Sequence, residues 1–478
     1  MIISNKLPGS STVSAAAWSI CKSFVGAVPA ILALLVFASV SLAQLTLPKA
    51  VDSALAAYPS IQAAQEQTKV AAAQVNLART AYLPKADVLG QANVATHNNV
   101  FGLLLPQPVG VIPSISGPVL GTNSPSPVLG TAIGILVNWE PFDFGRRKAE
   151  IGVNEAARSK AAAEVDVTRL QVAAETAAAF LTIRAAEETE KAAVAAVTRA
   201  ESFQTVINAL VNAELRPGVE ASRSKAEVAA ARIQLIQARQ AVAVAKAALA
   251  QWVGGDAASL GLAKSGDPEP PAALAVSTPE KSPFALAQRA AIDEIKARSK
   301  TLDFAYKPKI NLEGSTYARG TGVQPNGQGS GVFSGLGPNI QNWSLGVNIT
   351  FSASELPGIR AKRDAESHRQ LADEARYKQI MREIDSRTAR ATAMLEGARL
   401  VAEQTPTGVA ASREAEAQAR ARYQAGLGTI TDVADAQRRL TQAEIDHSLA
   451  RLNIWRGLLD LAITSGDLGP FLKLAEGL

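Results

Sequence analysis

The feature that most constrains this chain is an internal duplication, because two copies of the same series of segments follow each other. AYLPKADVLGQANVATHN, from Ala81, is similar to AYKPKINLEGSTYAR, from Ala305. GILVNWEPFDFGRRKAE is similar to LGVNITFSASELPGIRAKRDAE, and NAELRPGVEASRSKAE aligns with QAGLGTITDVADAQ. Each copy predicts helix, strand, Gly/Pro-rich loop, strand, long helix, turn and helix, so two equivalent halves have to form one fold.

The two copies are separated by a segment rich in Gly, Pro and Ser. We expect the first repeat over 44–253, the linker over 254–283, the second repeat over 284–467 and a tail over 468–478. The expected strands cover about 84–96 and 132–142 in the first repeat, and about 308–318 and 342–352 in the second.

Long helices follow the second strand of each copy. From Arg146 to Ala213 and from Ile359 to Ala425 the chain is nearly free of helix breakers. At ~1.5 Å per residue, each helix would extend on the order of 100 Å. Pro406 interrupts the second run and is expected to kink or split it.

The shorter helices carry a heptad seam, in which apolar or small residues alternate at spacings of three and four. Its positions are Val228, Ala231, Leu235, Ala238, Val242, Ala245, Leu249 and Trp252 in the first copy, and Leu440, Ala443, His447, Ala450, Ile454, Gly457, Leu461 and Thr464 in the second. A single seam of this kind is typical of any coiled coil. Two matched seams in one duplicated chain indicate a built assembly of helices.

The first 43 residues predict a secretory signal peptide. They hold two lysines and no acids, and an apolar run leads to small residues ending at Ala43. An uncleaved anchor is the alternative, although the run is short for a span of ~20 residues. The only cysteine, Cys21, precedes the apolar run, so the exported chain would have no disulfide, no thiol nucleophile and no Cys-ligated metal.

Charge gives no support for a nucleic-acid partner. The formal charge of +5 falls to about +3 when the two leader lysines are removed, and no basic patch is interleaved with aromatic residues.

Two of the expected strands alternate strictly between apolar and small or polar residues. The apolar positions are Ile133, Ile135, Val137 and Trp139 in one strand, and Trp343, Leu345, Val347, Ile349 and Phe351 in the other. A strand that faces lipid on one side and a lumen on the other needs this pattern. A half-buried strand of a soluble sheet has the same period, but the predicted export and the flanking helices favour the lipid-facing interpretation.

Four strands in one chain cannot close a barrel, for which about eight are the smallest useful number. An open sheet in lipid would leave unpaired edge groups at several kcal/mol each, so several copies must pool their strands. Two copies give a filled eight-stranded barrel, and three give twelve strands and room for water. The loops over Thr96–Thr131 and Arg319–Asn342 lie away from the helices and would face the outside of the cell.

No catalytic, cofactor or metal site is apparent in the sequence, and the protein is not expected to be an enzyme. The three histidines are His97 in an expected loop, His368 on an exposed helix face and His447 in a seam. No two of them have ligand spacing, and none lies beside a motif that suggests a catalytic triad.

The order of elements, the junction NWEPFDFGRR and the segment RYQAGLGTITDVADAQ together resemble the TolC family of outer-membrane efflux proteins, roughly over Leu45–Asp467. The resemblance implies a mainly helical fold with a small β part, assembled as a homotrimer with a twelve-stranded barrel in outer-membrane lipid and a periplasmic α-helical tunnel. It implies a passive exit duct for tripartite efflux or type I secretion, which works with a periplasmic adaptor and an inner-membrane pump. The alternative is a periplasmic coiled-coil scaffold or adaptor with a soluble β domain, which the apolar strand faces and the long Gly/Pro loops disfavour. The exported substrate is not readable from the sequence.

Two acidic residues lie in the first turns of the last helix with a heptad seam. Asp432 and Asp435 are three residues apart and share a helix face. Acids suit a helix N-terminus, and Thr429 with Asp432 is close to a capping box. The resemblance places both acids at the periplasmic mouth, where threefold symmetry would give rings of carboxylates that attract cations. The first copy has Glu220 and Arg223 at the matching positions, so the second helix pair is expected to carry the gate.

The resemblance also assigns roles at the tips of the helix pairs. Tyr423 is expected to bind Glu220 on the neighbouring pair, while Gly428 replaces a family arginine and so removes one restraint on closure. Residues expected to dock the adaptor are Ala213, Glu214 and Leu215 in one turn, and Ala425, Gly426, Leu427 and Thr429 in the other. Arg216 and Pro217 depart from the small residues usual in the first turn.

Overall fold

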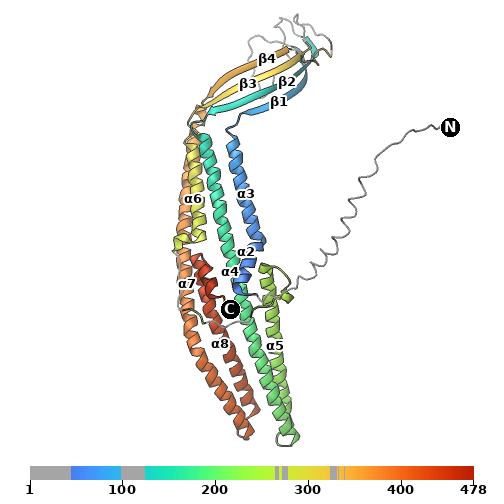
Figure 1. The fold of residues 1–478 in the computed structure, drawn as a ribbon, viewed down its shortest axis with the longest axis vertical. Coiled ribbons are helices and arrows are strands. Elements are labelled where there is room, and N and C mark those ends of the chain that lie inside the picture. Colours follow the sequence, from blue (N-terminus) through green and yellow to red (C-terminus); the bar gives the residue numbers. More distant parts are fainter. Residues whose placement is uncertain are drawn as a thin grey trace, which may run out of the picture.

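The computed structural model describes residues 45–97, 124–263, 269–271, 278–322, 331, 333–338 and 340–478. The molecule is elongated and gently curved, with a sheet at one end and long helices over the rest of its length (Figure 1). The expected signal peptide, with Cys21, and most of the two long strand-connecting loops lie outside the described residues.

The two copies contain the same series of elements, except that two helices precede the strands in the first copy and one in the second. The first has helices α2 (Leu47–Ala57) and α3 (Pro59–Thr80), strands β1 (Lys85–His97) and β2 (Ser124–Phe142), and helices α4 (Arg146–Asn212) and α5 (Gly218–Val253). The second has helix α6 (Pro283–Leu302), strands β3 (Lys309–Thr321) and β4 (Ile340–Thr350), and helices α7 (Leu356–Gln424) and α8 (Ile430–Ser465).

The two helical hairpins, α4–α5 and α7–α8, correspond residue for residue. α4 and α7 end at Asn212 and Gln424, and α5 and α8 begin at Gly218 and Ile430, so matching positions on both sides of the turn differ by 212. The offset is 210 where α4 and α7 begin, at Arg146 and Leu356. The duplication seen in the sequence is therefore preserved in the structure down to the turn.

Several expectations need correction. α7 continues through Pro406 as one helix, so the predicted split is wrong. β2 begins at Ser124, earlier than the expected 132. The linker contains two short 3₁₀ turns, Ala257–Ser259 and Pro279–Lys281, and the segment predicted as a tail forms helix α9 (Gly469–Leu474).

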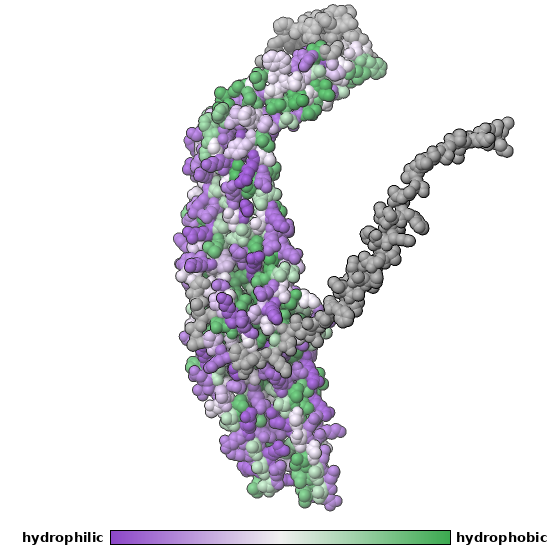
Figure 2. Space-filling model, in the orientation of Figure 1, coloured by the Kyte–Doolittle hydropathy of each residue, from purple (hydrophilic) through white to green (hydrophobic). Residues whose placement is uncertain are grey.

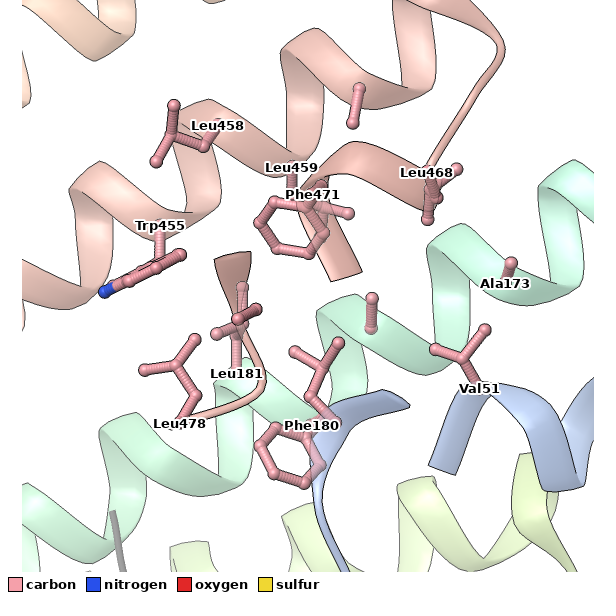
Figure 3. Close-up of a cluster of buried hydrophobic side chains, with 14 of the residues drawn as sticks. Val51, Ala173, Phe180, Leu181, Trp455, Leu458, Leu459, Leu468, Phe471 and Leu478 are labelled. Carbon is pink, nitrogen blue, oxygen red and sulfur yellow. The ribbon is translucent and has the colours of Figure 1, made fainter. Parts of the chain in front are cut away.

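The largest apolar core lies at mid-length, where α2, α4, α8 and α9 meet (Figure 3). Phe180 of α4 and Phe471 of α9 are fully buried there, and Trp455 lies edge-on to Phe471 with ring centroids 6.3 Å apart. Small seam residues bring the helices close together. A Cβ atom added at Gly457 of α8 would lie 3.1 Å from Cα of Leu395 in α7. This core holds α4 and α7 near their middles, and α5 and α8 near their sheet-proximal ends.

The sheet is a four-stranded antiparallel meander in the order β1-β2-β3-β4. The β2–β3 ladder joins the two copies, with Val137 opposite Gly314. At the end of β2, Asp143 accepts the Arg147 backbone N–H at 2.7 Å and thereby starts α4. Arg146 bridges Glu140 at 2.6 Å and Glu150 at 2.7 Å, which fastens the sheet to the first turns of the helix. Among the described residues, no helix is long and apolar enough to cross a membrane.

Candidate functional site

The two hairpins end in turns with the same hydrogen-bond pattern. In the first, the N–H groups of Glu214 and Leu215 donate to Val211 and Leu210; in the second, those of Gly426 and Leu427 donate to Tyr423 and Arg422. These are Schellman motifs, which need a left-handed residue after the helix end. Gly426 supplies it with φ 79°, whereas Glu214 adopts φ 59° without the freedom of glycine.

The leucine that follows each left-handed residue projects into solvent at the tip. Leu215 is 70% exposed and Leu427 is 72% exposed. The other residues expected to dock an adaptor, Ala213, Glu214, Ala425, Gly426 and Thr429, are also exposed. Each hairpin therefore presents one equivalent apolar knob at its end.

Tyr423 joins the two hairpins. Its side chain is fully buried, and its hydroxyl donates to Oε2 of Glu220 in α5 at 2.5 Å. Phe203 of α4 packs edge-on against the ring at 5.3 Å, and the small apolar cluster is completed by Ile207, Ile430 and Val433. The structure thus brings together Tyr423 and Glu220, the pair that the family resemblance led us to expect.

Arg216 is a site residue that sequence reasoning missed. It lies in the first turn, yet its Nη2 donates to the backbone oxygen of Tyr423 at 2.8 Å, and its guanidinium lies 4.7 Å from the centre of the tyrosine ring. Its Nη1 is 4.0 Å from Oε1 of Glu220. When the two hairpins are aligned with the offset of 212 residues, Arg216 corresponds to Gly428. At that position the resemblance leads one to expect an arginine. That correspondence was the signal that could have identified it.

The environment of Tyr423 favours its neutral form. Burial, the hydrogen bond to Glu220 and the charge of Glu220 raise the pKa of Tyr423 to about 12, against a smaller opposing effect of Arg216. The hydroxyl therefore remains a donor across the whole neutral and mildly alkaline range.

Asp432 and Thr429 form a complete capping box at the start of α8. The Thr429 backbone N–H donates to Asp432 Oδ2 at 2.9 Å, and the Asp432 N–H donates to Thr429 Oγ1 at 3.2 Å. The backbone and hydroxyl hydrogen bonds from Thr429 hold the pKa of Asp432 below its usual value. The carboxylate is exposed and stays ionised at neutral pH.

Asp435 lies one turn further along the same helix and is also exposed. Arg438 Nη2 donates to its Oδ1 at 2.5 Å. In the first hairpin Arg223 occupies the matching position, so only α8 carries two acids at its tip. Both acids have a partner within their own helix, yet both remain open to water.

The strand register places the predicted apolar positions of β2 and β4 on one face of the sheet. Ile135 lies opposite Thr316 of β3, which in turn lies opposite Trp343 of β4. Directly paired residues point to the same side of an antiparallel sheet. The exposed members of this face are Ile133, Ile135, Val137, Trp139, Trp343, Leu345, Val347 and Ile349, with Val88 and Val94 of β1. Phe351 follows directly after β4 and is 53% exposed.

The opposite face of the sheet is mostly polar, although Leu89, Leu136 and Ile340 also lie on it. It carries Asp87, Gln91, Asn138, Glu313, Ser315, Asn342, Ser344 and Asn348. Ser315 and Ser344 share a hydroxyl–hydroxyl hydrogen bond of 2.7 Å. Figure 2 shows hydrophobic residues gathered over the described part of the sheet, while the helical region is largely hydrophilic with scattered apolar residues.

The histidines lie apart from one another. His97 is the last residue of β1 rather than part of a loop, His368 is exposed on α7, and His447 Nδ1 lies 3.0 Å from Thr405 Oγ1. Within the described part of the chain, no group of His, Cys, Asp and Glu side chains is arranged to hold a metal ion.

The chain matches a known protein family over most of its length. The model of the family described as outer membrane efflux protein matches residues 50–255 and 278–466. No curated protein sequence matches the chain.

Solved structures of outer-membrane channels share the fold. The channel OprN is 19% identical with a TM-score of 0.70, over 89% of this chain and 90% of that one. CmeC of Campylobacter jejuni is 16% identical with a TM-score of 0.71, over 88% and 85%. The open state of MtrE from Neisseria gonorrhoeae is 20% identical with a TM-score of 0.66, over 88% and 89%.

Proposed function

This chain belongs to the outer membrane efflux protein family, and from that premise we propose that it is the passive outer-membrane exit duct of a tripartite efflux pump or a type I secretion system. It has no chemistry of its own in this proposal. A periplasmic adaptor opens it, and an inner-membrane transporter supplies the energy.

The observation that carries the proposal is the exposed apolar face of the sheet. Its large side chains range from 37% exposed at Trp139 to 78% at Trp343. Soluble monomers rarely expose a contiguous apolar patch of more than a few hundred Å². Because the other face is polar, the sheet suits a wall between lipid and a water-filled lumen.

The two sheet edges support a homotrimer. β1 and β4 each pair with one neighbour among the described residues, so both edges offer unpaired backbone groups. In lipid these groups must be paired, and three copies joined β4 to β1 would make a twelve-stranded barrel. The long hairpins of three copies would continue the barrel as a periplasmic tunnel.

The tip supports the gate and docking assignments. Tyr423 and Glu220 hold the hairpins of one chain together, and Asp432 and Asp435 would form carboxylate rings around the threefold axis. The equivalent knobs Leu215 and Leu427 would be buried by the adaptor. We expect Leu427→Asp to abolish export by the full pump while trimers still form, whereas Leu400→Asp, at an exposed leucine far from the tip, leaves export intact.

The experiment that tests the proposal is extraction and reconstitution of the full-length protein. We expect it to require detergent, to migrate as a heat-sensitive trimer and to form conducting pores in planar bilayers. A water-soluble monomer without conductance would contradict the proposal and favour the periplasmic scaffold, since a soluble β domain would need no detergent.

A further inference from the structure

The first strand of each copy begins with a lysine. Lys85 starts β1 and Lys309 starts β3, and each follows a proline in the repeated segments AYLPK and AYKPK. Lys85 pairs with Asn138 of β2, and Lys309 pairs with Thr350 of β4. Asn138 and Thr350 differ by the same 212 residues that relate the tips of the helical hairpins. The two lysines therefore occupy equivalent places in two β-hairpins of matching register.

Both lysines lie on the polar face of the sheet. Directly paired residues point to the same side, and alternate residues of a strand share a face. Lys85 therefore lies on the side of Asn138, and Lys309 lies on the side of Thr350 and Asn348. Both are exposed, and neither has an ion-pair or hydrogen-bond partner within the part of the chain that the structure describes.

Lysine is the only charged residue that this face repeats. When the copies are aligned on the segments AYLPK and AYKPK, each other charged residue among the paired positions of the face has an uncharged counterpart: Asp87 has Asn311, Glu313 has Leu89, and Arg319 has Ala95. Each of those three charges occurs once per chain. The lysine occurs twice, at the end of the sheet that joins the helices.

Several acids at the junction of sheet and helices already have cationic partners. The pairs are Glu140 with Arg146 at 2.6 Å, Asp143 with Arg147 at 3.8 Å and Asp303 with Arg363 at 3.3 Å. On the face itself, Asp87 lies two residues beyond Lys85, whereas Lys309 has the neutral Asn311 in that place. This end of the polar face therefore keeps an excess of positive charge.

The strand pairing also gives the spacing of the two lysines. Asn138 pairs with both Lys85 and Glu313, so these two lie in one row two strands apart. Lys309 precedes Glu313 by four residues on β3. With ~4.8 Å between strands and ~3.4 Å per residue, the two lysine backbones are about 16 Å apart. One small anion cannot contact both, so they act together through the electrostatic potential that they create.

We infer that Lys85 and Lys309 form a collar of ammonium groups around the lumen, two from each of three copies, which attracts anionic groups of the exported substrate. The inference rests on the proposed function, because three joined chains are needed to close the polar face around a lumen. The matching register places both lysines of a chain at one level of the barrel. Rings of lysine or arginine favour anions in pores, so the collar suits substrates that carry a carboxylate, phosphate or sulfonate group.

Ion selectivity of the full-length protein in planar bilayers tests the collar. We expect Lys85→Gln with Lys309→Gln to shift the potassium-to-chloride permeability ratio towards potassium by about twofold or more near 10 mM salt, where the Debye length is about 30 Å. Each single variant should give a similar part of the shift, because the two positions are equivalent. Near 1 M salt, where the Debye length is about 3 Å, the difference should disappear.

Inorganic tripolyphosphate is the probe for an anionic substrate group. Added on the barrel side at low salt, it should block the unmodified channel at a concentration about threefold or more below that needed for the double glutamine variant. Lys85→Arg with Lys309→Arg should keep the block, and Lys281→Gln, on the exposed linker turn, is the matched control. If pores form and the glutamine variant leaves both selectivity and block unchanged, the collar is overturned while the proposed function stands.

Thiol labelling in detergent measures the local potential without any need for conductance. Lys309→Cys in a Cys21→Ser background gives a chain with one thiol, because Cys21 is the only native cysteine. Adding Lys85→Gln should lower the ratio of its reaction rates with anionic and cationic methanethiosulfonates about twofold at low salt. An unchanged ratio would overturn the collar. If the protein forms trimers without pores, the proposed function fails and this ratio still decides the collar, whereas a soluble monomer would overturn both.

Discussion

The Tyr423 hydroxyl donates to the Glu220 carboxylate at 2.5 Å, and the two residues are 203 positions apart in the chain. This bond, with the buried tyrosine ring between Phe203 and Arg216, fastens the α7–α8 hairpin to the α4–α5 hairpin at their tips. Any opening of the tip in which the hairpins separate has to break it.

Tyr423→Phe should therefore loosen the tip while leaving the ring packing intact. A hydrogen bond to a charged group contributes about 1.5–3 kcal/mol, and solvent access to Glu220 places this one at the low end. We expect the open probability in planar bilayers to rise about tenfold, with trimer stability unchanged. Tyr377→Phe, on α7 but away from the tip, is the matched control. An equal effect of both variants would show that the Tyr423–Glu220 hydrogen bond, called the latch below, does not keep the tip closed.

The hydrogen bond from Tyr423 to Glu220 should be lost at high pH. The pKa of Tyr423 is raised to about 12 from an ordinary value of 10.0, so its stabilising effect is complete below about pH 10 and is lost as pH rises towards 12. Channels should open progressively over this window, and Tyr423→Phe channels should not. Ultraviolet titration of tyrosinate absorbance would show one late-titrating tyrosine that is missing in the variant.

Arg216 should act on the same latch from the other side. Its guanidinium stacks on the Tyr423 ring and donates to the Tyr423 backbone oxygen, so Arg216→Gln should raise the open probability several-fold. Arg216→Lys keeps the charge but loses the planar stacking, and we expect only partial rescue. The matched control is Arg223→Gln, since Arg223 is exposed on the following helix. A full rescue by lysine would mean that charge alone matters.

The architecture was predictable because duplication and alternation are periodic signals that local sequence carries. The strand faces, the seams and the paired turns all follow from spacing. The unbroken course of α7 through Pro406 was not predictable, because it depends on a local side-chain contact. The Thr405 hydroxyl donates to the carbonyl oxygen of Ala402, which has no N–H partner at the proline. The packing of the final segment as α9 was also missed, because it depends on the distant core residues Phe180 and Trp455.

At the tip, the Tyr423–Glu220 pair came from family resemblance, whereas the role of Arg216 depended on geometry. From the sequence alone, an arginine in a turn is expected to be exposed to solvent. Only the position of the second hairpin brings Tyr423 beneath it. Contacts between segments far apart in the chain carry no local periodicity, so spacing alone could not give this contact, although the correspondence of Arg216 with Gly428 in the two copies marked the residue.

Substitution of Asp432 and Asp435 tests whether the carboxylates at the tip act through their charge or through capping of the helix. Asp432→Asn with Asp435→Asn removes two charges per chain while an amide oxygen remains available to accept the Thr429 N–H. We expect weaker cation selectivity in asymmetric-salt recordings, with an unchanged melting temperature of the trimer. Asp385→Asn, at an exposed acid far from the tip, should leave selectivity unaltered. Unchanged selectivity in the double variant would remove these acids from the pore.

Neighbouring residues of β4 offer the sharpest test of the membrane-facing surface. Val347 lies on the apolar face and Asn348 on the polar face, and both are exposed in the single chain. Val347→Arg should cost about 2–4 kcal/mol if the residue meets the middle of a bilayer, and it should lower the yield of membrane-inserted, heat-sensitive trimers. Asn348→Arg should insert normally, because its side chain would face water in the lumen, and it should shift conductance or ion selectivity instead. In a soluble β domain both positions would tolerate arginine equally, so equal yields of the two variants would contradict the lipid-facing assignment.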